Sequence, residues 1–404
     1  MIKKLCVCVT FLLILLLIIS CGWLFGGRPP GFRELQCDCT GDCAGFVTVT
    51  VSTRDRKSNE KVCLSTTHLS VKYDRIDDLS PMSSLTNLKD LRMEYCAVTD
   101  ISFLSTLTNL ETLVLSGNEI SDIAPLRSLT ALKHLDLGNN NTITDISYLK
   151  MLTSMLHLDL SSNRITDISS LENMTDLNVL WLRNNQITDI SPLGNLTELN
   201  VLHLSENNIT DISPVRTLTD LRSLSFSENQ IEDISFLENL TKLNGLYMEG
   251  NRITDISVLE QFPELEWLAM PGNQFADISV LGSLTKLENL FIGDNRVDDI
   301  SILSSLVKLE RLGLSRCQIA DISPLASLTA LRMLDLNNNL ITDISVISLL
   351  PELRELSLKN NQITDITPLM SLGYMEEIDI SNNPVSDEQI KKLKSAISYN
   401  RFYP

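Results

Sequence analysis

Four polar residues in the first half of the chain have the types and the spacing that could bind a metal ion. His134 and Asp136 are separated by one residue, and His157 and Asp159 repeat this arrangement 23 residues later. Imidazole and carboxylate groups are common ligands of zinc and of other divalent cations. The sequence shows no further group that would orient these ligands. We therefore favour a solvated polar patch, with the metal site as the alternative.

Five large side chains form a second group that could make specific contacts. They are Trp181, His203, Tyr247, Trp267 and Phe291, in a chain in which Phe, Trp and Tyr together make up only 5% of the residues. Aromatic side chains carry much of the binding free energy at many protein interfaces. Their significance depends on whether the fold places all five on one surface.

The composition and the motifs exclude several classes of function. The chain has 404 residues, of which 33 are basic and 51 acidic, giving a net charge of −18. Such a surface repels nucleic acid. The sequence contains no H-E-x-x-H, no G-x-S-x-G and no phosphate-binding loop, and it has only four histidines. We therefore predict a protein that is not an enzyme, has no catalytic residues and needs no cofactor.

The elements that must position these residues are copies of one repeat. An Asp in a D-I-S-like string recurs every 22 residues, with one step of 23 from Asp122 to Asp145. The positions are Asp78, Asp100, Asp122, Asp145, Asp167, Asp189, Asp211, Asp233, Asp255, Asp277, Asp299, Asp321, Asp343 and Asp365. One unit has Leu110, Leu113 and Leu115 ahead of Asn118, which is the leucine-rich repeat pattern. About fifteen such coils fit between residues 67 and 384.

Each position of the unit has a physical reason. Leu113 and Leu115 alternate with other residues, as in a short strand with one face in the core. The amide of Asn118 can satisfy backbone groups that the following bend leaves unpaired, and the Asp caps a short helical turn. One unit cannot offset its own ordering entropy, so units must stack. The pattern predicts a leucine-rich repeat solenoid, an α/β-type horseshoe with a parallel β-sheet on the concave face and short 3-10 or helical turns on the convex face.

The repeat register predicts which side chains line the concave surface. Residues that flank the two inward leucines of a strand point outward, and Trp181, His203, Tyr247, Trp267 and Phe291 all occupy such positions in the middle coils. The repeat leaves these positions free, so we predict that the five residues form a protein-binding surface. The alternative is that a sheet accepts aromatic residues anywhere and that the protein is a structural, adhesin-like spacer without a specific ligand.

The N-terminus has the features of an export signal. Lys3 and Lys4 precede fifteen uncharged residues, 5–19, and the string Ile-Ile-Ser-Cys then ends at Cys21. This ending resembles the bacterial lipoprotein signal, in which the Cys is lipidated and becomes the first residue. We predict a signal segment over residues 1–20, a lipidated Cys21 and a linker over residues 21–35.

An uncleaved membrane anchor is the alternative for the same segment. Residues 5–25 contain no charge and approach the length of about 20 residues that a bilayer-spanning helix needs. In both interpretations Lys3 and Lys4 stay in the cytoplasm, as the positive-inside rule requires. The protein is therefore expected at the extracytoplasmic face of a bacterial membrane, held by a lipid or by one N-terminal transmembrane anchor.

Four cysteines are clustered just ahead of the repeats. Cys37, Cys39, Cys43 and Cys63 lie in a segment that we expect to be exported, where such a cluster usually forms two disulfides. The sequence leaves all three connectivities open. A zinc site is the alternative, although Cys-x-Cys-x3-Cys without a nearby His is poor zinc-ligand spacing. We predict a cysteine-containing N-terminal cap over residues 36–66.

A helix is expected at the other end of the repeats. Ser386 and Gln389 match a capping box, and Ile390, Leu393 and Ile397 share one helical face. We predict a C-terminal capping helix and tail over residues 385–404.

The repeat unit resembles a known family. The string T-D-I-S-P-L at residues 188–193 resembles the 22-residue repeat of the internalins, a family of bacterial surface proteins, and the resemblance covers about 320 residues. It implies a protein or peptide partner on the concave face. The helical N-terminal cap of the internalins is replaced here by the cysteine-containing segment. A nuclear regulator of protein phosphatase 1 has repeats of the same length and is the alternative if the chain is not exported.

Substitution of Cys21 by Ala should abolish incorporation of a fatty acid, because the lipid is attached through this thiol. Metabolic labelling of bacterial cells with a clickable palmitate measures this, with Cys8→Ala as the control. Undiminished labelling of the Cys21→Ala variant contradicts lipidation at this residue. A parent chain that takes up no label favours the uncleaved anchor.

Overall fold

The computed structural model describes residues 35–37, 43, 45–52, 57–73 and 75–404. The predicted signal segment, Cys21, the anchor segment and Cys39 lie outside these residues. The chain divides into two units, residues 1–35 and 36–404, and all described residues except Leu35 belong to the second. Within the described part of the chain, no helix combines the length and the apolar character needed to cross a bilayer.

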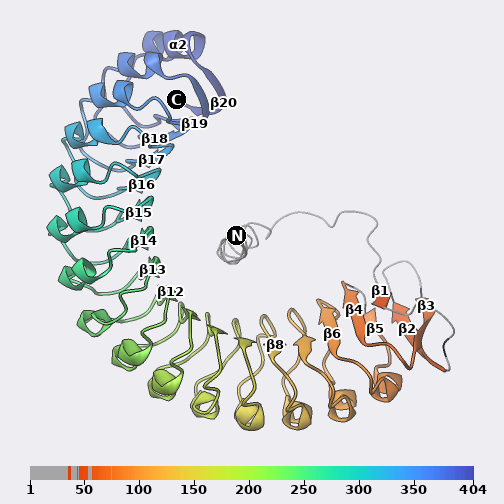
Figure 1. Ribbon diagram of the computed structural model, residues 1–404. Coiled ribbons are helices and arrows are strands. Elements are labelled where there is room, and N and C mark those ends of the chain that lie inside the picture. The colour runs from red at the N-terminus through yellow and green to blue at the C-terminus, as the bar shows by residue number, and fades with distance from the viewer. Residues whose placement is uncertain (1–34, 38–42, 44, 53–56, 74) are drawn as a thin grey trace, which may run out of the picture. The chain divides into compact units, whose positions relative to one another are not determined.

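The second unit is built on one parallel sheet on its concave side (Figure 1). Sixteen of its seventeen strands are β4 (His68–Lys72), β6 (Asp90–Glu94), β7 (Thr112–Val114), β8 (His134–Asp136), β9 (His157–Asp159), β10 (Val179–Trp181), β11 (Val201–His203), β12 (Ser223–Ser225), β13 (Gly245–Tyr247), β14 (Trp267–Ala269), β15 (Asn289–Phe291), β16 (Arg311–Gly313), β17 (Met333–Asp335), β18 (Glu355–Ser357), β19 (Tyr374–Asp379) and β20 (Ser398–Tyr403). Each strand pairs in parallel with the next one along the chain. Residues at the same repeat position are paired, as Leu180 is with Leu202.

Short 3-10 helices form the convex side of the same coils (Figure 1). They are η1 (Ser80–Ser84), η2 (Ser102–Thr106), η3 (Ala124–Ser128), η4 (Ser147–Met151), η5 (Ser169–Leu171), η6 (Ser191–Asn195), η7 (Ser213–Thr217), η8 (Ser235–Leu237), η9 (Ser257–Gln261), η10 (Ser279–Ser283), η11 (Ser301–Ser305), η12 (Ser323–Ser327), η13 (Ser345–Leu349) and η14 (Thr367–Ser371). The predicted leucine-rich repeat solenoid, with its sheet on the concave face and 3-10 turns on the convex face, is confirmed.

The repeat leucines and isoleucines fill the space between the sheet and the 3-10 helices. In the coil of β7, Leu113, Leu115, Ile120 and Leu126 are fully buried. The same positions are buried in coil after coil, so each coil covers the apolar faces of its neighbours. At about 25 cal/mol for each Å² of apolar surface, this stacking supplies the stability that a single coil lacks.

The periodic aspartates start the 3-10 helices. In all fourteen coils an Oδ1 atom of the Asp accepts a hydrogen bond from the backbone N–H two residues later, as Asp189 does from Ser191 at 2.8 Å. The bond satisfies an N–H that the helix leaves unpaired. The Asp therefore has the capping role that its position in the repeat predicts.

Buried asparagines link each coil to the coil before it. Asn207 donates from Nδ2 to the carbonyls of Leu182 and Leu204, both at 2.9 Å, and its Oδ1 accepts from the N–H of Ile187 at 3.0 Å. The same donation to the preceding coil is made by Asn118, Asn140, Asn163, Asn185, Asn229, Asn251, Asn273, Asn295, Asn339, Asn361 and Asn383. Cys96 and Cys317 occupy this position in two coils, and their thiols approach carbonyls at 3.3–3.5 Å.

A small antiparallel sheet lies against the first coil. Besides β1 (Leu35–Cys37), this end of the chain contains β2 (Phe46–Ser52), β3 (Lys57–Cys63) and β5 (Arg75–Ile76), with β2 between the other two strands of the small sheet. The segment that forms β2 alternates apolar and polar residues, as a strand with one covered face requires. This strand packs against η1. A disulfide joins Cys43 to Cys63, which are two of the four cysteines in the predicted cluster.

The last coil is followed by helix α2 (Asp387–Ala396). The side chain of Ser386 accepts a hydrogen bond from the N–H of Gln389 at 3.4 Å. The side chain of Gln389 donates to Asp365 at 3.4 Å, so the structure contains only half of the expected capping box. After the helix, residues expected to form a tail instead form β20, which pairs in parallel with β19 and extends the sheet by one strand.

Asn207→Ala should lower the free energy of unfolding by about 1 to 3 kcal/mol, because it leaves the N–H of Ile187 unpaired in the core and removes one of the two asparagine hydrogen bonds at each of two carbonyls. Asn208→Ala is the matched control, since the neighbouring side chain is exposed. Urea unfolding followed by far-ultraviolet circular dichroism compares the two, and hydrogen exchange at Ile187 locates the effect. Equal stabilities for the two variants would show that the asparagine does not hold the coils together.

Candidate functional site

The sheet arranges the outward side chains in columns that run across the coils. One column passes through Asp159, Trp181, His203 and Ser225, which are successive partners on β9 to β12. It continues through Tyr247, Ala269 and Phe291 on β13 to β15, while Trp267 lies in the flanking column beside Gly245. The concave positions assigned from the repeat are therefore the ones observed.

The five predicted binding residues form two groups within one stretch of this surface, which we call the aromatic stripe. Trp181 and His203 are neighbours, with ring centroids 6.1 Å apart. In the second group, Trp267 lies between Tyr247 and Phe291, with 6.1 Å between ring centroids in each pair. All five side chains are half-buried. The rings thus offer apolar faces and still pack on the protein.

Small residues let these rings lie along the sheet. A Cβ atom on Gly313 would come within 2.6 Å of the Phe291 ring, and one on Gly245 would come within 3.3 Å of the Tyr247 ring. Ser223 and Ser225 of β12 separate the two groups and are buried. The stripe therefore consists of two aromatic areas. The surface between them is lower, because it is formed by small residues.

Three polar atoms in this region are buried without a hydrogen-bond partner. They are Nε1 of Trp181, Nε2 of His203 and Oγ of Ser223. Burial, with a further effect of the Arg183 charge, lowers the pKa of His203 to about 4, so this imidazole is neutral at physiological pH. Buried polar groups are normally paired, and these three would gain hydrogen bonds from a ligand on the stripe.

The four residues considered for metal binding line a separate hollow of about 110 Å³ beside Trp181. The rings of His134 and His157 contact each other, with centroids 4.6 Å apart. The carboxylates accept backbone hydrogen bonds further along their strands, Asp136 from Gly138 at 2.9 Å and Asp159 from Ser161 at 2.8 Å. Among the described residues no group of three or more His, Cys, Asp or Glu is arranged to hold a metal ion.

Burial changes the protonation of the two carboxyl groups in this hollow. It raises the pKa of Asp136, and burial together with the neighbouring Asp136 raises the pKa of Asp159 to about 7. Burial also lowers the pKa of both His134 and His157. All four shifts favour the neutral forms of these side chains. The hollow therefore has the character of a polar patch with little charge.

Two features of the concave side were not identified from the sequence. Tyr73 and Tyr95 stack with ring centroids 5.4 Å apart, and both have a left-handed backbone. Glu266, Glu288 and Glu310 occupy one repeat position in three consecutive coils. In both cases the spacing of 22 residues is visible in the sequence.

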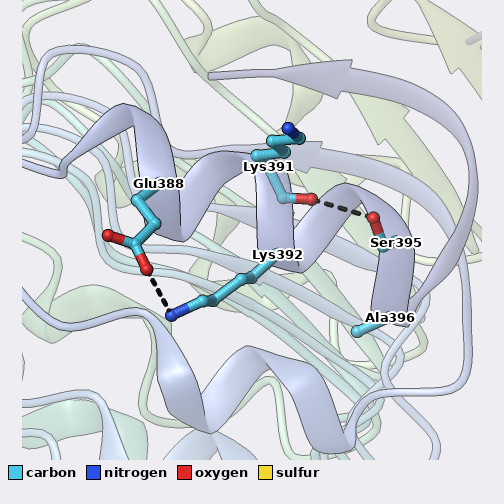
Figure 2. Close-up of a pocket in the computed structure, with 5 residues that line it drawn as sticks. All are labelled: Glu388, Lys391, Lys392, Ser395 and Ala396. Atoms are coloured by element: carbon cyan, nitrogen blue, oxygen red, sulfur yellow. Dashed lines mark hydrogen bonds and ion pairs between the residues drawn. The ribbon is translucent and has the colours of Figure 1, made fainter.

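A hollow on α2 has the character of an ordinary solvated helix face. It is lined by Glu388, Lys391, Lys392, Ser395 and Ala396. Figure 2 shows that these groups pair with one another, Glu388 with Lys392 at 2.7 Å and the hydroxyl of Ser395 with the carbonyl of Lys391 at 3.0 Å. This face leaves few polar groups for a ligand.

Asp159→Asn should remove a pH dependence of stability. With its pKa raised, the folded state binds more protons than the unfolded state between about pH 4 and pH 7. The contribution of Asp159 to the free energy of unfolding therefore falls as pH rises through that window, by at most about 1.4 kcal/mol per pH unit.

Urea unfolding at pH 5, 6, 7 and 8 measures this effect. The variant should show a flatter pH profile than the parent protein. Asp277→Asn is the control, because hydrogen bonds from Ser279 lower the pKa of Asp277 and keep it ionised throughout this range. Parallel profiles for Asp159→Asn and the parent protein would contradict the raised pKa.

Comparison with known proteins agrees with this architecture. The family model "Leucine Rich repeats (2 copies)" matches residues 108–151, 153–195, 177–217, 197–239, 219–261, 307–349 and 351–395. The solved structure of internalin InlF from Listeria monocytogenes is 39% identical, covers 80% of this chain and 90% of its own, and has a TM-score of 0.69. A search of curated protein sequences finds no match.

Two more distant structures share the fold. A leucine-rich repeat protein of Leptospira interrogans is 22% identical, with 79% of this chain and 91% of that chain covered and a TM-score of 0.64. The ectodomain of the receptor kinase GASSHO1/SCHENGEN3 from Arabidopsis thaliana, in complex with CASPARIAN STRIP INTEGRITY FACTOR 2, is 24% identical. The match covers 80% of this chain and 42% of that chain, with a TM-score of 0.63. From the repeats, their geometry and the likeness to InlF, the chain belongs to the internalin-like leucine-rich repeat proteins.

Proposed function

We propose that the protein binds a protein or peptide partner on its concave face through the aromatic stripe. The observation that carries this proposal is the gathering of Trp181, His203, Tyr247, Trp267 and Phe291 on five of the six strands from β10 to β15, where three buried polar atoms, on Trp181, His203 and Ser223, have no partner. Half-buried aromatic rings lose little conformational freedom on binding and bury a large apolar area. No catalytic role forms part of the proposal.

The leucine-rich repeat fold is used for such recognition in other proteins. The Arabidopsis ectodomain was solved in complex with CASPARIAN STRIP INTEGRITY FACTOR 2, and a plant peptide hormone receptor, RGFR1, in complex with RGF2. Both are under 25% identical to this chain, so only the class of partner, a protein or a peptide, is carried over to the proposal.

The binding domain would be held at the extracytoplasmic face of a bacterial membrane. In this arrangement residues 1–20 are the export signal, Cys21 carries the lipid, residues 21–35 form the linker, and residues 36–66 and 385–404 close the two ends of the repeats at 67–384. An uncleaved anchor over residues 5–25 would give the same topology. The Cys43–Cys63 disulfide supports export, since disulfides persist in oxidising compartments.

Replacement of both Trp181 and Trp267 by Ala should abolish partner binding and leave the fold intact, because both side chains lie outside the leucine core. The full chain, its double variant and a control are immobilised and exposed to envelope and host-cell extracts, and retained proteins are quantified by mass spectrometry. Met151→Ala with Val307→Ala is the control, since these apolar residues are 66% and 55% exposed outside the stripe.

The expected result is a protein retained by the parent chain and the control and lost from the tryptophan variant. Far-ultraviolet circular dichroism checks that all three chains are folded. If the folded tryptophan variant retains every protein that the parent retains, the proposed binding surface is wrong and the spacer function is favoured.

A further inference from the structure

Three glutamates form a ladder along one edge of the aromatic stripe. The backbone N–H of Glu288 donates to the carbonyl of Glu266 at 3.0 Å, and that of Glu310 donates to the carbonyl of Glu288 at 2.8 Å. Consecutive strands in a sheet are about 4.8 Å apart, so like charges are stacked in three successive coils. Glu266 directly precedes Trp267, so this acidic ladder begins next to the residue that forms the middle ring of the second group.

In other coils, the repeat position of these three glutamates is occupied by residues of alternating charge, which neutralise one another. In earlier coils Glu111 lies between Lys89 and Lys133 and pairs with both, at 3.5 and 2.8 Å. In the described part of the chain, Glu266 and Glu288 have no ion pair, and Glu310 has only Arg332 at 3.9 Å. Burial and the charges of Glu266 and Glu310 raise the pKa of Glu288. The ladder is thus an unfavourable arrangement that the repeat does not require.

Acidic groups also lie on the opposite edge of the stripe. Glu249 follows Tyr247 on the same strand face, and Glu228 lies close to it, since burial and the charge of Glu228 raise the pKa of Glu249. Glu228 has a left-handed backbone, with φ of 54°, and its carboxylate lies over Gly250. Neither glutamate forms an ion pair with another described residue. The aromatic rings are therefore bordered on both sides by glutamates, of which only Glu310 has an ion pair, the 3.9 Å contact with Arg332.

A buried hydroxyl on the floor of the stripe gives independent support for a ligand. Ser223 is only 5% exposed, its Oγ has no hydrogen-bond partner, and it faces outward in the same column as Trp267. A Cβ atom on the neighbouring Gly245 would lie 3.7 Å from this oxygen and 3.6 Å from the Tyr247 hydroxyl. A hydroxyl in this position can donate to or accept from the backbone of a bound chain.

We propose that the partner segment bound at this surface is an extended, basic peptide, in which Lys or Arg side chains lie across the aromatic stripe and end at the two acidic edges. This inference rests on the proposed function and specifies its partner. Lys and Arg stems cover apolar rings while their charged heads stay near the ring faces or reach carboxylates. The strands from β12 to β16 span about 19 Å, which about six extended residues would cross.

Fluorescence anisotropy with a labelled eight-residue peptide of alternating Lys and Ala tests this inference on the full chain. The Glu–Ala peptide is the negative probe, and spermine is the cationic competitor. The parent protein should bind the Lys–Ala peptide at low salt, more weakly at 0.5 M salt, and should not bind the Glu–Ala peptide. The variant Glu266→Gln, Glu288→Gln, Glu310→Gln should bind at least tenfold more weakly.

A second triple variant, Glu172→Gln, Glu238→Gln, Glu260→Gln, is the matched control, because it removes the same charge from exposed residues on the convex side. It should bind like the parent. The Tm of the ladder variant should exceed that of the control, since only the ladder variant relieves stacked like charges.

Three results would overturn the inference. In the first, the parent protein does not bind the Lys–Ala peptide at low salt. In the second, the two triple variants weaken peptide binding equally. In the third, spermine competes with the labelled peptide as well as an unlabelled peptide of equal charge does. If one of these occurs while Trp181→Ala with Trp267→Ala still abolishes partner retention, the basic peptide is wrong and the binding function stands. If the tryptophan variant also retains its partner, the proposed function fails as well.

Discussion

The structure depends on one repeated interaction, the buried asparagine side chain that bonds each coil to the coil before it. Asn207 accepts from the N–H of Ile187, which the bend after the strand would otherwise leave unpaired in the core, and donates to two carbonyls that each also accept from a neighbouring asparagine. An unpaired buried group costs about 1 to 3 kcal/mol, so the bend is stable only when the next coil supplies its asparagine. The repeat therefore fixes both the stacking of the coils and the register of the sheet.

This register determines what the concave face can do. Because equivalent residues are partners on neighbouring strands, a residue placed in an outward position adds to a continuous column. In the early coils one such column is polar and internally paired, in the Lys89–Glu111–Lys133 series. Between β10 and β16 they contain aromatic rings on a floor of glycine and serine, with glutamates beside them of which only Glu310 has an ion pair. The leucine core is the same throughout, so recognition and stability are carried by different positions of the repeat.

Much of the fold could be predicted from the sequence, because each position of a 22-residue unit has one role. The strands, the aspartate caps, the asparagine bonds and the outward placement of Trp181 and Trp267 all follow from the period. The orientation of the rings could not be predicted, since it depends on small residues in contact with them, such as Gly313 one coil away from Phe291. The strand β20 and the half-formed capping box at Ser386 lie beyond the repeat, where periodicity gives no information. The four residues His134, Asp136, His157 and Asp159, for which a metal site was the alternative to a solvated polar patch, share a period, and their carboxylates bond to the backbone.

The central claim is that recognition takes place on the concave face of the middle coils. Site-specific photocrosslinking tests it most directly, with p-benzoylphenylalanine placed at Ala269 or Asn289 within the stripe and at Val307 or Glu260 outside it. All four side chains are at least partly exposed, so each can carry the crosslinker. The account predicts that a single partner is crosslinked from Ala269 and Asn289 and not from the other two positions. Equal crosslinking from all four positions, or crosslinking from Val307 and Glu260 alone, would contradict it.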